Sequence, residues 1–357
     1  MTTMTTVVPE EYRRLVRAAS PRPASWSEII GNARAVEHLR EALTAARLQD
    51  RAMPHTLLFG PPGVGKTTLA RLVAAEQGGG FVETTASTLE TFTDLIRILA
   101  KLNDERERTG RSSTLFLDEA HMLGQAKGRQ SIDQEAVFPL LEDFQLPHPL
   151  LGKTYTGDNS VEYRLLTSTY LVWPFSCIAA TTEPGMLSPP LLRRFLLHVE
   201  LEPYTEDDIA RIILGSAERL GWPIEAEAAR ELARYARRNP GRGYQLLTSA
   251  RNRAVATGRP TITLEVAREV IDRLHLYPLG LGETDVRVLR LLAERGPRGV
   301  GAAEIARAVG VSLSTFTGIV EPFLRVLFFI ETLSRRCIRP EGAAYLAALD
   351  ARERGAA

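Results

Sequence analysis

A lysine and two threonines follow a cluster of glycines in the stretch LLFGPPGVGKTTLARLVAAE, residues 57–76. The spacing from Gly60 to Gly65, Lys66 and Thr67 is that of a phosphate-binding loop. Glycines there let backbone N–H groups face the phosphates, the lysine neutralises them and the hydroxyl binds Mg²⁺. The alternative is an ordinary glycine turn, but a strand before and a helix after favour the loop, since a helix N-terminus attracts anions. We expect ATP and Mg²⁺ to bind at Gly60, Pro61, Pro62, Gly63, Gly65, Lys66, Thr67 and Thr68.

Two adjacent carboxylates end an apolar run further along, TLFLDEAH at residues 114–121. A carboxylate at a strand end beside a phosphate loop can hold Mg²⁺, and a second can take the proton of an attacking water. These would be Asp118 and Glu119 respectively. Alone, the pair could be a solvated acidic turn, but the lysine loop upstream makes the combination harder to obtain by chance. We assign no chemistry to His121, because a histidine at a strand end is more often packed than catalytic.

Further polar candidates follow a third apolar run, FSCIAATT at residues 175–182. Thr182 ends that run and could hold the attacking water, although a simple strand cap would have the same spacing. Arg193 and Arg194 could equally be solvated helix charges. Arg242 follows an Asn-Pro-Gly turn that would direct it back at the nucleotide, with a solvated arginine as the alternative.

The composition is ordinary for a soluble globular protein, with 44% hydrophobic and 24% charged residues among 357. A net charge of +1 provides no overall attraction for nucleic acid, so DNA contacts must come from local basic patches. Cys177 and Cys337 lie far apart without metal-ligand spacing, which favours free thiols in a reducing compartment. The first residues lack the apolar segment of a signal peptide, and no apolar run has membrane-spanning length. We therefore expect a cytoplasmic protein without membrane contact.

The order of periodic segments predicts an α/β fold with several domains. Two prolines near the end of residues 1–24 indicate an extended N-terminal arm. Residues 25–202 alternate apolar strands with helices, as expected of a P-loop ATPase domain with a parallel sheet. Residues 203–277 contain amphipathic helices suited to a helical lid. Residues 278–357 predict three short helices, a strand pair and a last helix, which is the order of a winged-helix domain.

A hairpin is predicted within the ATPase domain, near residues 146–175. The segment alternates apolar and polar residues on both sides of a turn signal, TGDNS at residues 156–160. Its large apolar residues are numerous for a connection, and exposed apolar surface of this kind marks a docking site. The alternative is that they pack on the ATPase core. They are Leu150, Leu151, Tyr155, Tyr163, Leu165, Leu166, Tyr170 and Trp173.

Together these stretches resemble the RuvB family of AAA+ ATPases, which are Holliday junction branch-migration motors. GPPGVGKTTLA, LFLDEAH, AATTEPGMLSPPLLRRF and NPGR occur in the family's order and spacing, and LLEDFQL and GLGETD are more particular to it. The resemblance covers nearly the whole chain and implies an ATPase domain, a lid and a DNA-binding winged helix. It also implies a homo-hexameric ring and a junction-binding partner, RuvA, that docks on the hairpin.

The resemblance gives a role to each matching residue. Lys66 and Thr67 would bind phosphate and Mg²⁺, Asp118 would complete the Mg²⁺ site and Glu119 would be the base. Arg194 matches the arginine finger that enters the neighbouring subunit's active site, so hydrolysis would require the ring. The remaining matches are Thr182 and Arg242 as nucleotide sensors and Arg22 beside the adenine pocket.

The predicted wing is basic, and in the family a basic wing grips the DNA backbone. Arg335, Arg336 and Arg339 lie in its stretch LSRRCIRP. The helix in the recognition position offers Arg325 set against Glu321, with few side chains suited to reading base edges. We therefore expect contacts to phosphate through the wing, with a wing that binds only protein as the alternative.

Three functions remain open on the sequence. The first is a ring motor that translocates duplex or four-way-junction DNA, the second an AAA+ ATPase that remodels a protein partner, and the third a nucleotide-switched DNA-binding regulator. We favour the motor. Stimulation of ATP hydrolysis separates them, because any duplex would stimulate the first, a protein alone the second and one preferred sequence the third.

Overall fold

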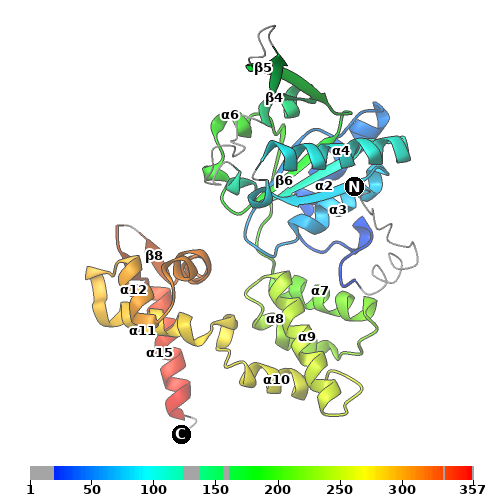
Figure 1. The fold of residues 1–357 in the computed structure, drawn as a ribbon. Coiled ribbons are helices and arrows are strands. Elements are labelled where there is room, and N and C mark those ends of the chain that lie inside the picture. Colours follow the sequence, from blue (N-terminus) through cyan, green and yellow to red (C-terminus); the bar gives the residue numbers. More distant parts are fainter. Residues whose placement is uncertain (1–19, 90, 124–136, 156–160, 333, 356–357) are drawn as a thin grey trace. The chain divides into compact units, whose positions relative to one another are not determined.

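The computed structural model describes residues 20–89, 91–123, 137–155, 161–332 and 334–355, with the side chains of residues 148–168 outside that description. The chain divides into two compact units, Ser20–Thr205 and the part from Glu206 onward (Figure 1). Most of the predicted arm, residues 1–24, lies outside the described residues.

The first unit contains a parallel sheet in the order β2-β3-β6-β1-β7. Every ladder in it is parallel, which confirms the predicted sheet type. The six residues of β6 are all buried, because helices cover both faces of such a sheet. The strands are β1 (Thr56–Phe59), β2 (Phe81–Thr85), β3 (Thr114–Asp118), β6 (Ser176–Thr181) and β7 (Leu197–Glu200).

Helices of this unit follow local signals in the sequence. The longest, α4, begins with a capping box formed by Thr91 and Asp94 and ends at Gly110, whose φ of 68° suits glycine. Its buried face, including Leu99, packs with strand residues such as Leu115 and Cys177 in one core. The α-helices are α2 (Ala33–Leu48), α3 (Lys66–Gln77), α4 (Phe92–Thr109), α5 (Phe138–Asp143) and α6 (Pro189–Leu192). Shorter 3₁₀ turns are η1 (Trp26–Glu28), η2 (Ala86–Thr88), η3 (Ala120–Met122) and η5 (Pro184–Met186).

The predicted hairpin is confirmed as two antiparallel strands, β4 (Gln145–Tyr155) and β5 (Val161–Leu171), which project from the unit in Figure 1. The turn signal at residues 156–160 lies outside the described residues. At the base, the Asn103 side chain of α4 donates to Leu171 O at 3.2 Å and accepts from Trp173 N at 2.9 Å. Leu146 is fully buried there. The core therefore fixes where the hairpin leaves the unit.

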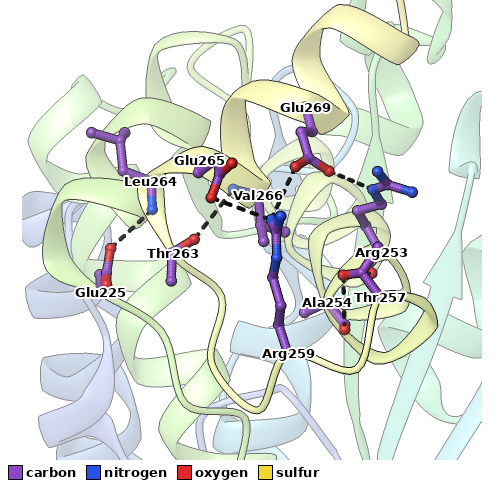
Figure 2. Close-up of polar contacts among 10 residues, drawn as sticks. All are labelled: Glu225, Arg253, Ala254, Thr257, Arg259, Thr263, Leu264, Glu265, Val266 and Glu269. Carbon is purple, nitrogen blue, oxygen red and sulfur yellow. Dashed lines mark hydrogen bonds and ion pairs between the residues drawn. The ribbon is translucent and has the colours of Figure 1, made fainter.

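The second unit begins with four helices, α7 (Glu206–Arg219), α8 (Ala226–Arg234), α9 (Pro240–Ala256) and α10 (Leu264–Arg273). Thr263 caps α10 by accepting a hydrogen bond from Val266 N. Arg259 and Arg253, on the α9 side, both bond Glu269 of α10 (Figure 2). Hydrogen bonds from these arginines, Arg253 first, lower the pKa of Glu269. Charged hydrogen bonds therefore connect the end of α9 to α10.

The C-terminal part has the element order predicted for a winged helix. Its third helical segment is one run with a π turn at Phe316–Val320 before Pro322, because a proline lacks the N–H that would continue an α-helical ladder. Val300 forms an antiparallel β-bridge with Arg336, so the backbone at Val300 extends the two-stranded wing. The elements are η6 (Pro278–Gly280), α11 (Glu283–Arg295), η7 (Gly296–Arg298), α12 (Ala302–Val309), α13 (Leu313–Thr315), η8 (Phe316–Val320), α14 (Glu321–Val326), β8 (Ile330–Thr332), β9 (Arg336–Ile338) and α15 (Pro340–Gly355).

Arg237 joins the lid helices to this C-terminal part. Its Nε donates to Gly280 O at 2.8 Å, and its guanidinium pairs with the buried Asp285 and lies 4.2 Å from the Phe323 ring centre. Asp285 belongs to the GLGETD stretch, so that motif helps to connect the lid helices to the C-terminal part.

Within the described ranges, no single helix has the length and apolar character needed to cross a membrane. One pair, Ala302–Val309 with Leu313–Val326, passes on length and composition only when its two helices, bent by 106°, are taken together.

Candidate active site

Three neighbouring strands carry the predicted chemistry at their carboxyl ends. β1 leads into Gly60, β3 ends at Asp118 and β6 ends at Thr181. In the sheet these strands are adjacent, in the order β3-β6-β1, and Phe59 is in register with Thr181. The carboxyl edge of a parallel sheet is where such folds bind ligands. Segments distant in sequence therefore meet at one edge.

The glycines of the loop adopt backbone conformations that other residues avoid. Gly60, Gly63 and Gly65 have φ of 141°, 77° and 102°. A Cβ on Gly60 would lie 2.3 Å from Leu201 O, so a side chain there would displace the chain after β7. These glycines keep the backbone exposed for a close approach, as phosphate binding requires.

Lys66 lies at the N-terminus of α3 and folds over the loop. Its Nζ donates to Gly60 O at 2.8 Å and to Pro61 O at 2.9 Å. Burial lowers the pKa of Lys66 from its ordinary value, while the charges of Glu119 and Asp118 oppose that shift. The lysine and the acidic pair therefore lie close enough to interact electrostatically.

The oxygen ligands available here fit Mg²⁺. Thr67 follows Lys66 in the first turn of α3, and Asp118 ends β3 at the same edge of the sheet. Mg²⁺ binds one or two protein oxygens together with substrate phosphates and waters, so this sparse set suits it. Among the described residues, no group of three or more His, Cys, Asp or Glu could hold a metal alone.

Glu119 does not continue the strand, contrary to the predicted run to residue 121. Its φ of 49° and ψ of 45° place it in the left-handed region, where it precedes the turn Ala120–Met122. Its Oε2 lies 3.3 Å from His121 Nδ1, which also lies 3.0 Å from Thr181 Oγ1. These contacts of His121 were not expected from the sequence, where its position two residues after the acidic pair was the only signal.

Thr182, the predicted sensor, follows the last residue of β6 and is half-buried. The buried hydroxyl at this strand end is that of Thr181, which accepts from Glu183 N at 3.0 Å. The strand is therefore shorter than the predicted run by one residue at each end, and the sensor role of Thr182 stays a prediction.

Two residues that the sequence analysis did not select support the loop from behind. The buried Tyr204 donates to Val64 O at 3.1 Å. Asn32 exchanges two hydrogen bonds with the backbone of Glu202, at 2.8 and 3.2 Å. The first contact connects the chain after β7 with the loop itself, and the second connects it with the start of α2.

Arg194, the predicted finger, is held within its own unit. Its Nη2 lies 2.8 Å from Glu142 Oε1, its Nη1 donates to Pro190 O at 2.8 Å, and its guanidinium lies 3.8 Å from the Phe138 ring centre. Its Nε is buried without a hydrogen-bond partner among the described atoms. Glu142 and Phe138 come from the stretch VFPLLEDFQL, so this family-specific motif surrounds the arginine.

The two remaining nucleotide candidates are not brought to the loop by any described contact. Arg22 is exposed, and its backbone N–H donates to Ser20 Oγ at 3.3 Å. Arg242 belongs to the second compact unit, where the Asn239 side chain caps α9 by accepting from its N–H. Burial lowers the pKa of Arg242, and Arg237 adds to that shift. Both nucleotide roles stay predictions.

The three wing arginines differ in their surroundings. Arg336 is only 18% exposed and donates two hydrogen bonds, of 2.9 and 3.1 Å, to the buried Glu321. This argues against its predicted DNA contact, because Arg336 neutralises a buried charge. Arg335 and Arg339 are 53% and 40% exposed, in surface ion pairs of 3.3 and 3.5 Å. Such pairs are weak, so these two remain candidates.

The comparisons with known proteins agree with this arrangement. The family model described as "Holliday junction DNA helicase RuvB P-loop domain" matches residues 21–201, and "RuvB AAA lid domain" matches residues 204–276. RuvB of Chloroflexus aurantiacus is 36% identical over 88% of this chain and 84% of its own length. RuvB of Nitratiruptor sp. is 32% identical over 88% of this chain and 87% of its own.

A solved structure gives the same result for the fold. The Thermotoga maritima RuvB Holliday junction branch migration motor matches with a TM-score of 0.74 and 29% identity, over 92% of this chain and 98% of that one. The matched regions thus include the phosphate loop, the acidic strand end and the lid. The chain belongs to the RuvB family.

Proposed function

We propose that this chain is a subunit of an ATP-driven ring motor that moves Holliday junction DNA. The observation that carries the proposal is that a RuvB-type P-loop domain is followed directly by a RuvB-type lid. The printed names of the relatives describe branch migration of Holliday junctions. We also propose that it acts in the cytoplasm and that it consists of the arm 1–24, the ATPase domain 25–202, the lid 203–277 and the winged helix 278–357.

The residues of the site divide the chemistry of ATP hydrolysis among them. Lys66 and the loop backbone hold phosphate oxygens, and Thr67 and Asp118 hold Mg²⁺, which neutralises charge on the phosphates. Glu119 takes the proton of the attacking water. Thr182 and Arg242 contact the nucleotide as sensors, and Arg22 lies beside the adenine.

The finger completes the site only in an assembly. Arg194 stabilises charge on the transferring phosphoryl group of the neighbouring subunit, which makes hydrolysis cooperative within a homo-hexamer. DNA backbone contacts come from Arg335 and Arg339 on the wing. The ring therefore couples hydrolysis at subunit interfaces to movement along DNA.

The decisive experiment measures ATP hydrolysis with and without duplex DNA, together with displacement of strands from a four-way junction. We expect stimulation by duplex of any sequence and ATP-dependent migration of the junction. Lys66→Ala is the control and should abolish ATP binding and both activities. Stimulation by a protein alone would support the remodelling alternative, and response to one preferred sequence would support the regulator.

We further propose that the β4–β5 hairpin docks a junction-binding partner protein. Leu171 and Trp173 at its base are 66% and 53% exposed, although Tyr170, the residue before Leu171, packs against the core. Replacing residues 154–164 by a two-residue turn should preserve folding, nucleotide binding and basal hydrolysis while abolishing stimulation by the partner. Unfolding of the trimmed protein would support the core alternative, and a full response to the partner would refute the docking role.

A further inference from the structure

His121 connects the proposed base to the neighbouring strand. Its side chain is 10% exposed, whereas that of Glu119 is 43% exposed. One ring nitrogen, Nδ1, lies within 3.3 Å of Glu119 Oε2 and 3.0 Å of Thr181 Oγ1. Thr181 is fully buried at the end of β6. A buried imidazole therefore contacts both the exposed carboxylate and a fixed point of the sheet.

Glu119 needs such a contact because its own backbone does not fix its side chain. The residue lies on a turn after the strand, with a φ of 49°. Ordering a glutamate side chain costs up to about 2 kcal/mol of conformational entropy. A general base acts only within hydrogen-bond reach of its proton, so a freely rotating carboxylate would be a poor one.

The proposed contact requires one tautomer of the imidazole. An ionised carboxylate can only accept a hydrogen bond, so a hydrogen bond from Nδ1 to Glu119 requires the tautomer that carries the hydrogen on Nδ1. Thr181 Oγ1 accepts from Glu183 N at 3.0 Å and has a second lone pair for the imidazole. Thr181 is in register with Phe59, the residue before Gly60 of the loop. The histidine therefore lies against the end of β6, the strand next to the one that leads into the phosphate loop.

We propose that His121 is a positioning residue for ATP hydrolysis, whose Nδ1–H holds the Glu119 carboxylate in a fixed relation to the ends of β6 and β1. The inference rests on the proposed role of Glu119 as the base. His121 contacts neither the water nor the nucleotide in this role. Its removal should therefore lower kcat while leaving ATP affinity unchanged.

Three substitutions at this position separate the hydrogen bond from the packing. His121→Asn places an amide nitrogen where Nδ1 stands, because both atoms are bonded to Cγ. His121→Gln places its amide one bond further out, and His121→Phe keeps the ring without a donor. We expect the Gln and Phe variants to lose kcat by about 10- to 100-fold, since small displacements of a reacting group have effects of that order. The Asn variant should retain kcat, at the same ATP affinity and melting temperature as the Gln variant.

The experiment includes Glu119→Gln alone and combined with His121→Phe. If His121 acts through Glu119, the double variant should be no slower than Glu119→Gln. A normal rate for Glu119→Gln would refute the base assignment itself. A slow Glu119→Gln with a normal His121→Phe would refute only the positioning role, as would equal losses in the Asn, Gln and Phe variants.

Discussion

The guanidinium of Arg194 lies 2.8 Å from the carboxylate of Glu142, within one subunit. Arg194 is 18% exposed at its side chain and Glu142 is 54% exposed. An arginine finger has to reach the active site of a neighbouring subunit. This ion pair therefore competes with the proposed role of Arg194.

Glu142→Gln should raise the rate of ATP hydrolysis by about two- to fivefold, the range expected for losing a partly exposed ion pair. The amide keeps the shape of the side chain but removes the charge that restrains Arg194. Steady-state hydrolysis by assembled rings measures the effect. Asp143→Asn, an exposed neighbour, is the matched control and should leave the rate unchanged. A slower Glu142→Gln enzyme would show that Glu142 orients the finger instead of restraining it.

Mixed rings test whether Arg194 works in trans. Arg194→Ala subunits keep an intact phosphate loop but lack the finger, and Lys66→Ala subunits keep the finger but lack an intact loop. Each variant alone should therefore be inactive. Mixing them should restore some hydrolysis at interfaces where a good finger meets a good loop. Arg193→Ala, at the exposed neighbouring position, should remain active by itself. No recovery in rings that exchange subunits would exclude the trans role.

Acid should destabilise the first unit through His55. Its Nε2 donates to Leu141 O at 2.9 Å and its Nδ1 accepts from Cys177 N at 3.0 Å, so the buried ring is neutral. Burial lowers the pKa of His55 from 6.5 to about 4. The unfolded chain binds the proton first, so this stability is present above pH 6.5 and is lost as the pH falls towards 4.

The difference between wild type and His55→Gln isolates this effect. Glutamine supplies one donor and one acceptor but does not ionise. Urea unfolding at pH 7 and pH 4.5 should show that wild type loses up to about 3 kcal/mol more than the variant, as expected for such a shift in pKa. Equal losses would mean that His55 does not control the acid sensitivity.

Arg336→Ala and Arg335→Ala should have different consequences. Removing Arg336 leaves Glu321 charged and buried, so the C-terminal part should lose about 3–5 kcal/mol of stability. Removing Arg335 should leave the melting temperature unchanged, lower duplex affinity for all sequences alike and reduce the salt slope by about one unit. Thermal unfolding and DNA binding at several salt concentrations measure both. If the Arg336→Ala protein is as stable as wild type but binds DNA more weakly, then Arg336 contacts DNA after all.

The sequence by itself determined the parts that depend on neighbouring residues. The glycine spacing around Lys66 specifies the loop because only glycine tolerates those backbone angles. Helix α4 follows from the cap at Thr91 and the glycine at its end. The strands around residues 156–160 were recognisable from alternation, since a period of two is a local property of an extended chain.

Only the tertiary structure decided which distant side chains meet. Arg194 and Glu142, His121 and Thr181, and Arg336 and Glu321 are each separated in the sequence, and no spacing rule predicts their contacts. The wing illustrates the reason, because Arg335 and Arg336 are neighbours of the same type whose side chains have different partners. Whether an arginine faces water or neutralises a buried carboxylate depends on how the elements pack, and packing is a property of the whole fold.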